Sequence, residues 1–98
     1  MESTLLAPTV TQKEDVSQLH FPSGEVLFNS EDIASRIISL HYASKLGNRD
    51  RYKVKIIFQD EEVMRKVETT VWAVTDKMVV LKMGVLIPIC RIHEVKFL

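Results

Sequence analysis

The sequence is poor in cysteine, glycine and proline, and it has no excess of either charge. Its 98 residues include one cysteine, three glycines and three prolines, and 13 Lys+Arg balance 13 Asp+Glu. A single cysteine excludes an intrachain disulfide scaffold and favours a reducing compartment. Three scattered glycines exclude a glycine-rich loop of the kind that cradles phosphates. Zero net charge removes the broad positive field that is typical of proteins coating nucleic acid or anionic lipid.

Long apolar runs are also missing. The sequence starts Met1-Glu2, without the basic start and the apolar stretch of about 7–15 residues that a secretory signal has. The longest apolar run is far short of the roughly 20 residues that span a bilayer. It reads Val85-Leu86-Ile87-Pro88-Ile89-Cys90. We therefore expect a cytoplasmic protein that does not associate with membranes.

What is present fits one small folded domain. A chain of 98 residues has the length of one domain, and 27% charged with 46% hydrophobic residues is typical of a globular protein. Residues 1–20 mix polar residues, charges and Pro8 without an apolar period, which predicts a flexible N-terminal arm. Residues 21–98 are predicted to form a single folded domain.

The pattern of residues 30–46 predicts a helix. Asn29 or Ser30 can cap its first turn by accepting a bond from a free backbone N–H. Gly47 and Asn48 are residues that commonly end helices in the left-handed conformation. Apolar residues recur at helical spacing, namely Ile33, Ile37 and Leu40, with Ala34 and Ile38 widening the stripe. The helix is therefore expected to pack one apolar face on the rest of the domain.

From Tyr52 onward the period changes to the alternation that is typical of strands, with Val54, Ile56 and Phe58 on one face. Four more short strands follow, with one turn of tight helix before the last. Because no crossover of about 12 residues separates them, the strands are predicted to be antiparallel. A bend in the second strand favours a small closed or half-closed barrel. The predicted fold is α+β and mostly β: an N-terminal helix followed by a five-stranded antiparallel small barrel.

The last third of the sequence resembles known small barrels. An apolar strand, a glycine turn and an I-P-I-x-x-I-x-x-V pattern run from Val79 through Gly84 to Val95. This is similar to the close of Sm-like and SH3-like small barrels. The run Val67–Thr75 also resembles part of a family of short uncharacterised bacterial proteins from Bacteroidetes-type genomes, and the bacterial Rho-inhibitor family shares the general layout. The resemblance covers residues 30–98 and implies a fold more than a role, because small barrels host many unrelated functions.

Pleckstrin-like bacterial domains are the alternative. They contain a segment close to residues 74–95, but they normally close their barrel with a C-terminal helix. This sequence stops at Leu98, directly after the last predicted strand. The Sm-like or SH3-like barrel is therefore our first prediction.

The residues of a catalytic or metal site are sparse. Cys90 and His93 stand three apart, but a structural zinc site takes four ligands, usually as two close pairs. Arg91 stands beside Cys90, yet the sequence marks no base that could orient and activate the thiol for catalysis. The consecutive acids Asp60-Glu61-Glu62 fit a solvated turn. We therefore predict no enzyme, no metal and no cofactor.

Positive charge gathers in the second half of the chain. Residues 1–48 carry three positive and six negative side chains, whereas residues 49–98 carry ten and seven. Arg49, Arg51, Lys53 and Lys55 alternate along the first predicted strand, which would place four cations on one face. With Tyr52 or Trp72 nearby they could hold a strand of RNA by phosphate contacts and stacking. The solvated face of an amphipathic strand explains the same pattern, and Trp72 fits a core position and an exposed partner-binding position equally.

These observations predict a non-enzymatic interaction module that binds a protein partner or associates with itself. The alternative is an Sm-like RNA-binding regulator that uses Arg49, Arg51, Lys53, Lys55 and Trp72. A core of about 70 residues rarely supplies more than ~3–5 kcal/mol of stability, and an open barrel edge leaves backbone groups unpaired. We therefore expect a homo-oligomer.

Overall fold

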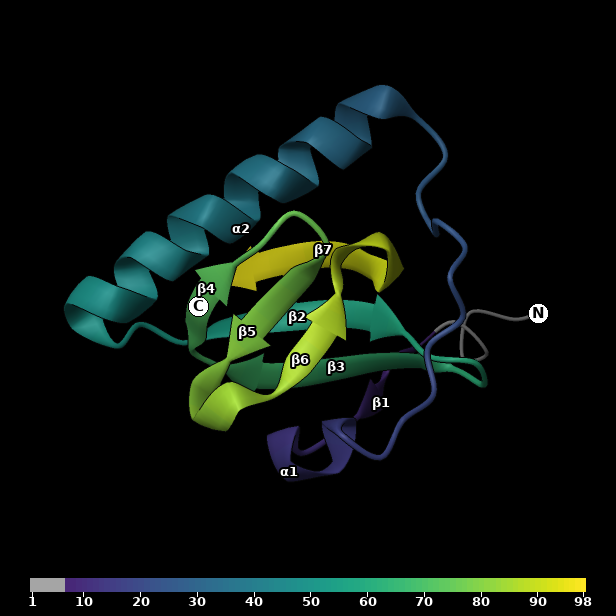
Figure 1. The fold of residues 1–98 in the computed structure, drawn as a ribbon, viewed down its shortest axis with the longest axis horizontal. Coiled ribbons are helices and arrows are strands. Elements are labelled where there is room, and N and C mark those ends of the chain that lie inside the picture. Colours follow the sequence, from purple (N-terminus) through teal and green to yellow (C-terminus); the bar gives the residue numbers. More distant parts are fainter. Residues whose placement is uncertain (1–6) are drawn as a thin grey trace.

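The computed structural model of the chain describes residues 7–98 and folds them into two sheets and one long helix (Figure 1). The elements in chain order are β1 (Thr9–Val10), α1 (Lys13–Val16), α2 (Ser30–Asp50), β2 (Val54–Gln59), β3 (Met64–Thr69), β4 (Val71–Val74), β5 (Met78–Leu81), η2 (Lys82–Gly84), β6 (Leu86–Pro88), η3 (Ile89–Arg91) and β7 (Ile92–Phe97). The α+β class is confirmed. The long helix, however, lies in the middle of the chain and not at its N-terminus. Residues 7–98 form seven strands and not the predicted five, because β1 is an extra strand and the predicted long second strand divides into β3 and β4.

The four-stranded sheet has the order β1-β3-β2-β7. Its central strand β2 pairs antiparallel with β3, where Ile56 faces Val67, and with β7, where Ile56 faces Val95. The predicted inward face of β2 is confirmed, since Val54, Ile56 and Phe58 are fully buried. The pairs among the strands predicted from Tyr52 onward are antiparallel, as expected. β1, which the sequence did not predict, pairs with β3 in parallel. A parallel pair is possible here because 53 residues separate Val10 from Met64.

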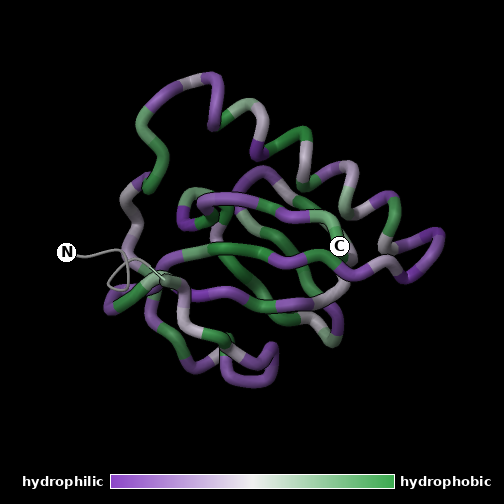
Figure 2. The backbone as a smooth tube through the Cα atoms, turned by 180° about the vertical axis from the view of Figure 1, so that it is seen from behind, coloured by the Kyte–Doolittle hydropathy of each residue, from purple (hydrophilic) through white to green (hydrophobic). Residues whose placement is uncertain are grey.

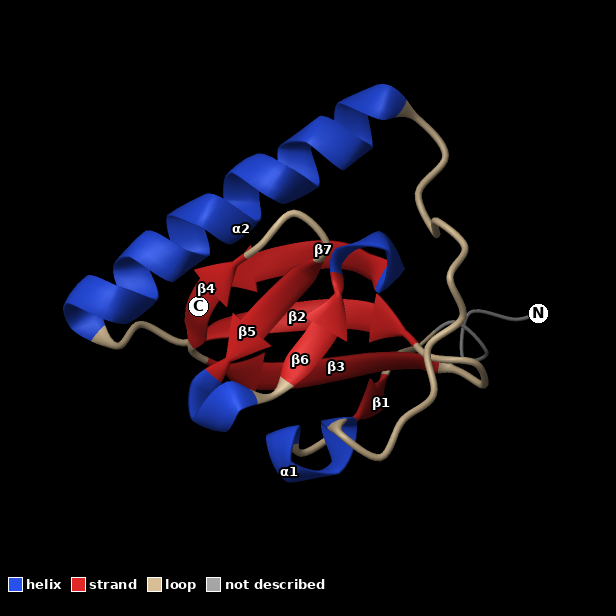
Figure 3. Cartoon of the chain, viewed as in Figure 1, coloured by secondary structure: helices blue, strands red, loops and turns tan. Residues whose placement is uncertain are grey.

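The three-stranded sheet has the order β4-β5-β6, and it lies across the four-stranded sheet (Figure 3). Thr70 alone separates β3 from β4, so the chain bends there from one sheet into the other, as the sequence predicted. Of the closed and the half-closed barrel that the sequence left open, the closed one does not form, because among residues 7–98 no ladder joins β6 to β7. Pro88 ends β6 without an N–H to donate, η3 follows at once, and the carbonyl of Cys90 accepts from the N–H of Val26 at 3.0 Å.

The core lies between the two sheets and beneath α2. Hydrophobic segments run along the strands in the middle of the molecule, and both ends of α2 are hydrophilic (Figure 2). The largest fully buried side chains are Phe58, Leu40, Ile56, Leu81, Ile87, Ile92, Val16, Val54, Val67, Val71 and Val79. α2 therefore completes the core by covering the edge where β4 and β7 lie.

The start of α2 is as predicted, and its end is not. The side chain of Asn29 caps the helix by accepting from the N–H of Asp32 at 2.8 Å. The helix then continues through Gly47 to Asp50, and Arg51 is the left-handed residue that ends it, with φ 55°. The prediction that Gly47 ends the helix is wrong. A Cβ atom at Gly47 would lie 2.4 Å from the carbonyl oxygen of Val71 in β4, so the glycine lets the helix approach the sheet closely.

The N-terminal segment contacts β3 in the part that the structure describes. Residues 1–6 of the predicted flexible arm lie outside the described residues. The N–H of Thr11 donates to the carbonyl of Lys66 at 2.8 Å, and the side chain of Val16 is fully buried in the core. Two elements, β1 and α1, therefore form within the predicted arm. The segment is held by contacts with β3, which no local pattern in its own sequence indicates.

Candidate interaction surfaces

α2 buries one face and exposes a second face that is also apolar. Leu40, Ala43 and Gly47 are buried, whereas Ile38 is 69% exposed and Tyr42 is 54% exposed. Ile38 and Tyr42 each stand two residues from Leu40 in the sequence. At about 100° per residue, both therefore lie on the opposite side of the helix from Leu40. The prediction that Ala34 and Ile38 widen the core-facing stripe is therefore wrong, because both are exposed. They belong to a separate exposed stripe.

The exposed apolar residues of α2 continue onto β7. The ring of Tyr42 lies 5.4 Å from the ring of Phe97, which is 39% exposed, and the ring of Tyr52 lies 6.4 Å from Phe97. The hydroxyl of Tyr52 donates to the carbonyl of Leu98, which ties the end of β7 to the start of β2. We call Ile38, Tyr42 and Phe97 the α2–β7 surface. Large aromatic and aliphatic side chains grouped at the surface are typical of protein interfaces.

Two buried guanidinium groups fix the orientation of α2. The side chain of Arg36 is 4% exposed, and it donates to both carboxylate oxygens of Glu25 at 2.7 Å and to the carbonyl of Ile92 at 3.0 Å. Arg91 donates to the carbonyls of Gly24 at 2.7 Å and Gln59 at 3.1 Å. These bonds join the segment before α2 to β7 and to the end of β2. The relative position of α2 and β7, and with it the α2–β7 surface, is thereby set.

The pair of Glu25 with Arg36 makes a pH-dependent contribution to stability. The hydrogen bonds from Arg36 lower the pKa of Glu25 from 4.5 to about 2. Because the folded state has the lower pKa, this stabilisation is fully present above about pH 4.5 and is lost as the pH falls towards 2. We expect the free energy of unfolding, measured with urea, to fall more steeply across this window in the wild type than in Glu25→Gln. Equal slopes in the two proteins would contradict the expectation.

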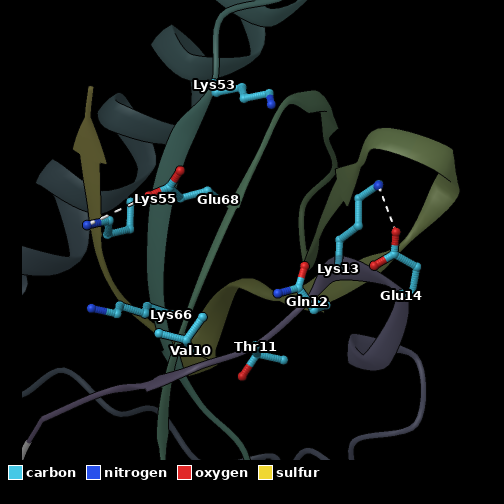
Figure 4. A pocket seen from close by; sticks show the side chains of 9 residues that line it. All are labelled: Val10, Thr11, Gln12, Lys13, Glu14, Lys53, Lys55, Lys66 and Glu68. Carbon is cyan, nitrogen blue, oxygen red and sulfur yellow. Dashed lines mark hydrogen bonds and ion pairs between the residues drawn. The ribbon is translucent and has the colours of Figure 1, made fainter.

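A charged hollow of about 490 Å³ lies on the four-stranded sheet, where β2 and β3 meet the segment from β1 to α1 (Figure 4). Its charged lining residues are Lys13, Lys53, Lys55, Lys66, Glu14 and Glu68. Lys13 lies 3.1 Å from Glu14 and Lys55 lies 3.9 Å from Glu68, so two of the four positive charges are balanced locally. In Figure 4 the lysine ammonium groups spread around the hollow and do not converge on one point. This arrangement suits an extended anion more than a compact one.

The structure separates the five residues that the sequence proposed as a binding site. Arg49 lies in α2 and pairs with Asp50 at 3.1 Å, and Arg51 is the residue that ends that helix. Only Lys53 and Lys55 reach the hollow. Trp72 is 44% exposed and lies in β4, in the other sheet. The predicted row of four cations on one strand does not form, because α2 runs four residues further than the sequence indicated.

Sequence reasoning missed the residues of the α2–β7 surface. Ala34, Ile38 and Tyr42 recur at i, i+4 and i+8, which is a second apolar stripe on the same helix. That spacing was the available signal for a helix with two apolar faces. Nothing in the local sequence marks Phe97, which reaches the surface through the pairing of β7 with β2.

The candidate metal ligands are each engaged elsewhere. The thiol of Cys90 donates to the carbonyl of Ser23 at 3.6 Å, and Nε2 of His93 lies 2.9 Å from Oε1 of Gln59. Residues 7–98 contain no group of three or more His, Cys, Asp or Glu side chains that could hold a metal ion.

In that same part of the chain no helix is both long enough and apolar enough to pass through a bilayer.

Compared with models of protein families, with curated proteins and with solved structures, the chain gives no match.

Proposed function

We propose that this protein is a non-catalytic interaction module that associates with a second copy of itself through the α2–β7 surface. The observation that carries the proposal is the exposure of Ile38, Tyr42 and Phe97 as one group, although each is a residue type that commonly lies in cores or interfaces. Arg36 in α2 donates to the carbonyl of Ile92 in β7 and so joins the two elements that carry the group. A preorganised apolar surface loses little conformational entropy on binding.

Self-association has a second physical motive in the size of the domain. The described residues build one small core, and such cores supply only modest stability. When the same surface of another copy covers Ile38, Tyr42 and Phe97, their apolar area is removed from water. This burial stabilises the dimer by roughly 25 cal/mol per Å². In a two-fold symmetric dimer, both subunits contribute the same surface to the interface.

The test is the molar mass of the protein as a function of concentration. We expect light scattering or sedimentation to show a monomer–dimer equilibrium, and Ile38→Glu to shift the protein to monomer by placing a charge at the centre of the contact. Met83→Gln is the matched control, since Met83 is 72% exposed but lies in η2, away from the α2–β7 surface. A monomeric wild type at every concentration would overturn the proposal.

An Sm-like RNA-binding role is the second candidate, and the charged hollow is the observation that favours it. Lys53, directly before β2, and Lys66, in β3, add to the positive charge of Lys13 and Lys55. The connectivity also supports a relation to Sm-like barrels, since Thr70 alone separates β3 and β4 of the two sheets, and the last strand returns to pair with β2.

This second role is tested by titrating the protein with mixed-sequence single-stranded RNA at several salt concentrations. Two phosphate contacts correspond to a change of about 1.4 in the slope of log K against log[salt]. We therefore expect Lys53→Glu combined with Lys66→Glu to weaken binding and to lower the slope by about that amount. The control is Lys82→Glu, an exposed lysine in η2 that does not line the hollow. Equal binding by both variants, or none by the wild type, would remove this candidate.

A further inference from the structure

We infer that two copies of this chain pair through their α2 helices, side by side and antiparallel, about a two-fold axis at Ile38. The inference rests on the proposed self-association and specifies its geometry. It follows from three features of α2: the angular position of its exposed residues, their spacing about Ile38, and the sign of their charges.

The exposed residues of α2 form one straight stripe. At 100° per residue, the side chains of Glu31, Ala34, Tyr42 and Lys45 all lie within about 40° of Ile38 around the helix axis. All five are exposed. Leu40, Ala43 and Gly47 lie on the opposite, buried side. Figure 1 shows α2 at the rim of the molecule, so a second helix can lie along the stripe.

The stripe is symmetric about Ile38. Ala34 and Tyr42 each lie four residues from it, and Glu31 and Lys45 each lie seven residues from it. In an antiparallel pair centred on Ile38, the two Ile38 side chains therefore meet, and the small Ala34 of each copy receives Tyr42 of the other. Glu31 of each copy faces Lys45 of the other, which gives two equivalent ion pairs.

The charges select the antiparallel arrangement. A parallel pair in register would place Glu31 against Glu31 and Lys45 against Lys45, which is repulsive at both ends. The antiparallel pair also opposes the two helix dipoles, so the N-terminus of each helix lies near the C-terminus of the other. Phe97, which packs against Tyr42, then flanks the contact on the β7 side. The occupant that fits this stripe is thus a second copy of the same helix.

Charge reversal tests the pairing. We expect Glu31→Lys and Lys45→Glu each to raise the dimer dissociation constant about tenfold at low salt, because each turns two attractive contacts into two repulsive ones. The double variant E31K/K45E restores both contacts and is expected to dimerise as the wild type does. In a parallel dimer neither single variant would add repulsion. Single variants that dimerise normally, or a double variant that stays weak, would overturn the antiparallel geometry.

Disulfide cross-linking gives a second readout. In a Cys90→Ser background, Ile38→Cys places two thiols at the two-fold axis, and we expect a covalent dimer under mild oxidation. Arg49→Cys is the control, because the antiparallel pair separates its two copies by about 33 Å along the helix axis. Cross-linking of Arg49→Cys, or failure of Ile38→Cys in a protein that is dimeric by mass, would overturn the geometry and leave self-association standing. A wild type that is monomeric by mass would instead overturn the proposed function itself.

Discussion

Replacing Gly47 by alanine is expected to destabilise the protein by about 3 kcal/mol, against the ordinary effect of this change in a helix. At an exposed position in a helix, alanine is about 1 kcal/mol more favourable than glycine. At Gly47 the added Cβ atom would lie 2.4 Å from the carbonyl oxygen of Val71 and 2.9 Å from Cγ2 of Thr70. A backbone oxygen in a paired strand cannot turn aside, so α2 must move away from β4.

The measurement is the free energy of unfolding from urea denaturation. Gly24→Ala is the matched control, because a Cβ atom there meets only Nη1 of Arg91, at an ordinary contact distance of 3.9 Å. We expect Gly24→Ala to change stability by less than about 1 kcal/mol. If Gly47→Ala is neutral or stabilising, the close approach of α2 to β4 is not what requires a glycine at this position.

Replacing Arg36 by methionine is expected to cost about 3 kcal/mol, the lower end of the range for breaking a buried ion pair. Methionine keeps much of the apolar stem but leaves the carboxylate of Glu25 and the carbonyl of Ile92 without their donor. The lower end applies because the side chain of Glu25 is 33% exposed, so water can solvate the carboxylate after the change.

Two further variants separate burial from charge. Arg49→Ala removes the pair with Asp50, whose side chain is 54% exposed beside an Arg49 side chain that is 69% exposed. We expect a loss below about 1 kcal/mol, as for other surface pairs. The double variant E25Q/R36M is expected to recover part of the loss of Arg36→Met, because no unpaired carboxylate remains. If Arg36→Met costs no more than Arg49→Ala, the buried pair does not hold the segment before α2.

The same contacts affect self-association. Arg36 and Arg91 fix the segment before α2, and α2 in turn presents Ile38 and Tyr42 beside Phe97. A variant that loosens α2 therefore also weakens the dimer, whereas Ile38→Glu acts at the contact and leaves the core intact. Measuring stability and molar mass on the same variants distinguishes the two effects.

Local patterns alone determined the elements of this protein well. Alternation placed β2 and its buried face of Val54, Ile56 and Phe58, and the Asn29 cap placed the start of α2. The bend between β3 and β4 and the turn of tight helix before β7 also followed from short stretches of sequence. Such features depend on neighbours a few residues apart, which is the range over which propensity and capping act.

Contacts between distant residues decided the rest. Gly47 resembles a helix end in sequence, and only the nearby backbone of Val71 shows that it serves packing inside a longer helix. That extension moved Arg49 and Arg51 off the first strand and dispersed the predicted cationic site. Tertiary packing likewise left one apolar stripe of α2 against the core and the other in water. Which face of a helix a sheet covers depends on contacts across the whole chain, and here those contacts exposed Ile38 and Tyr42.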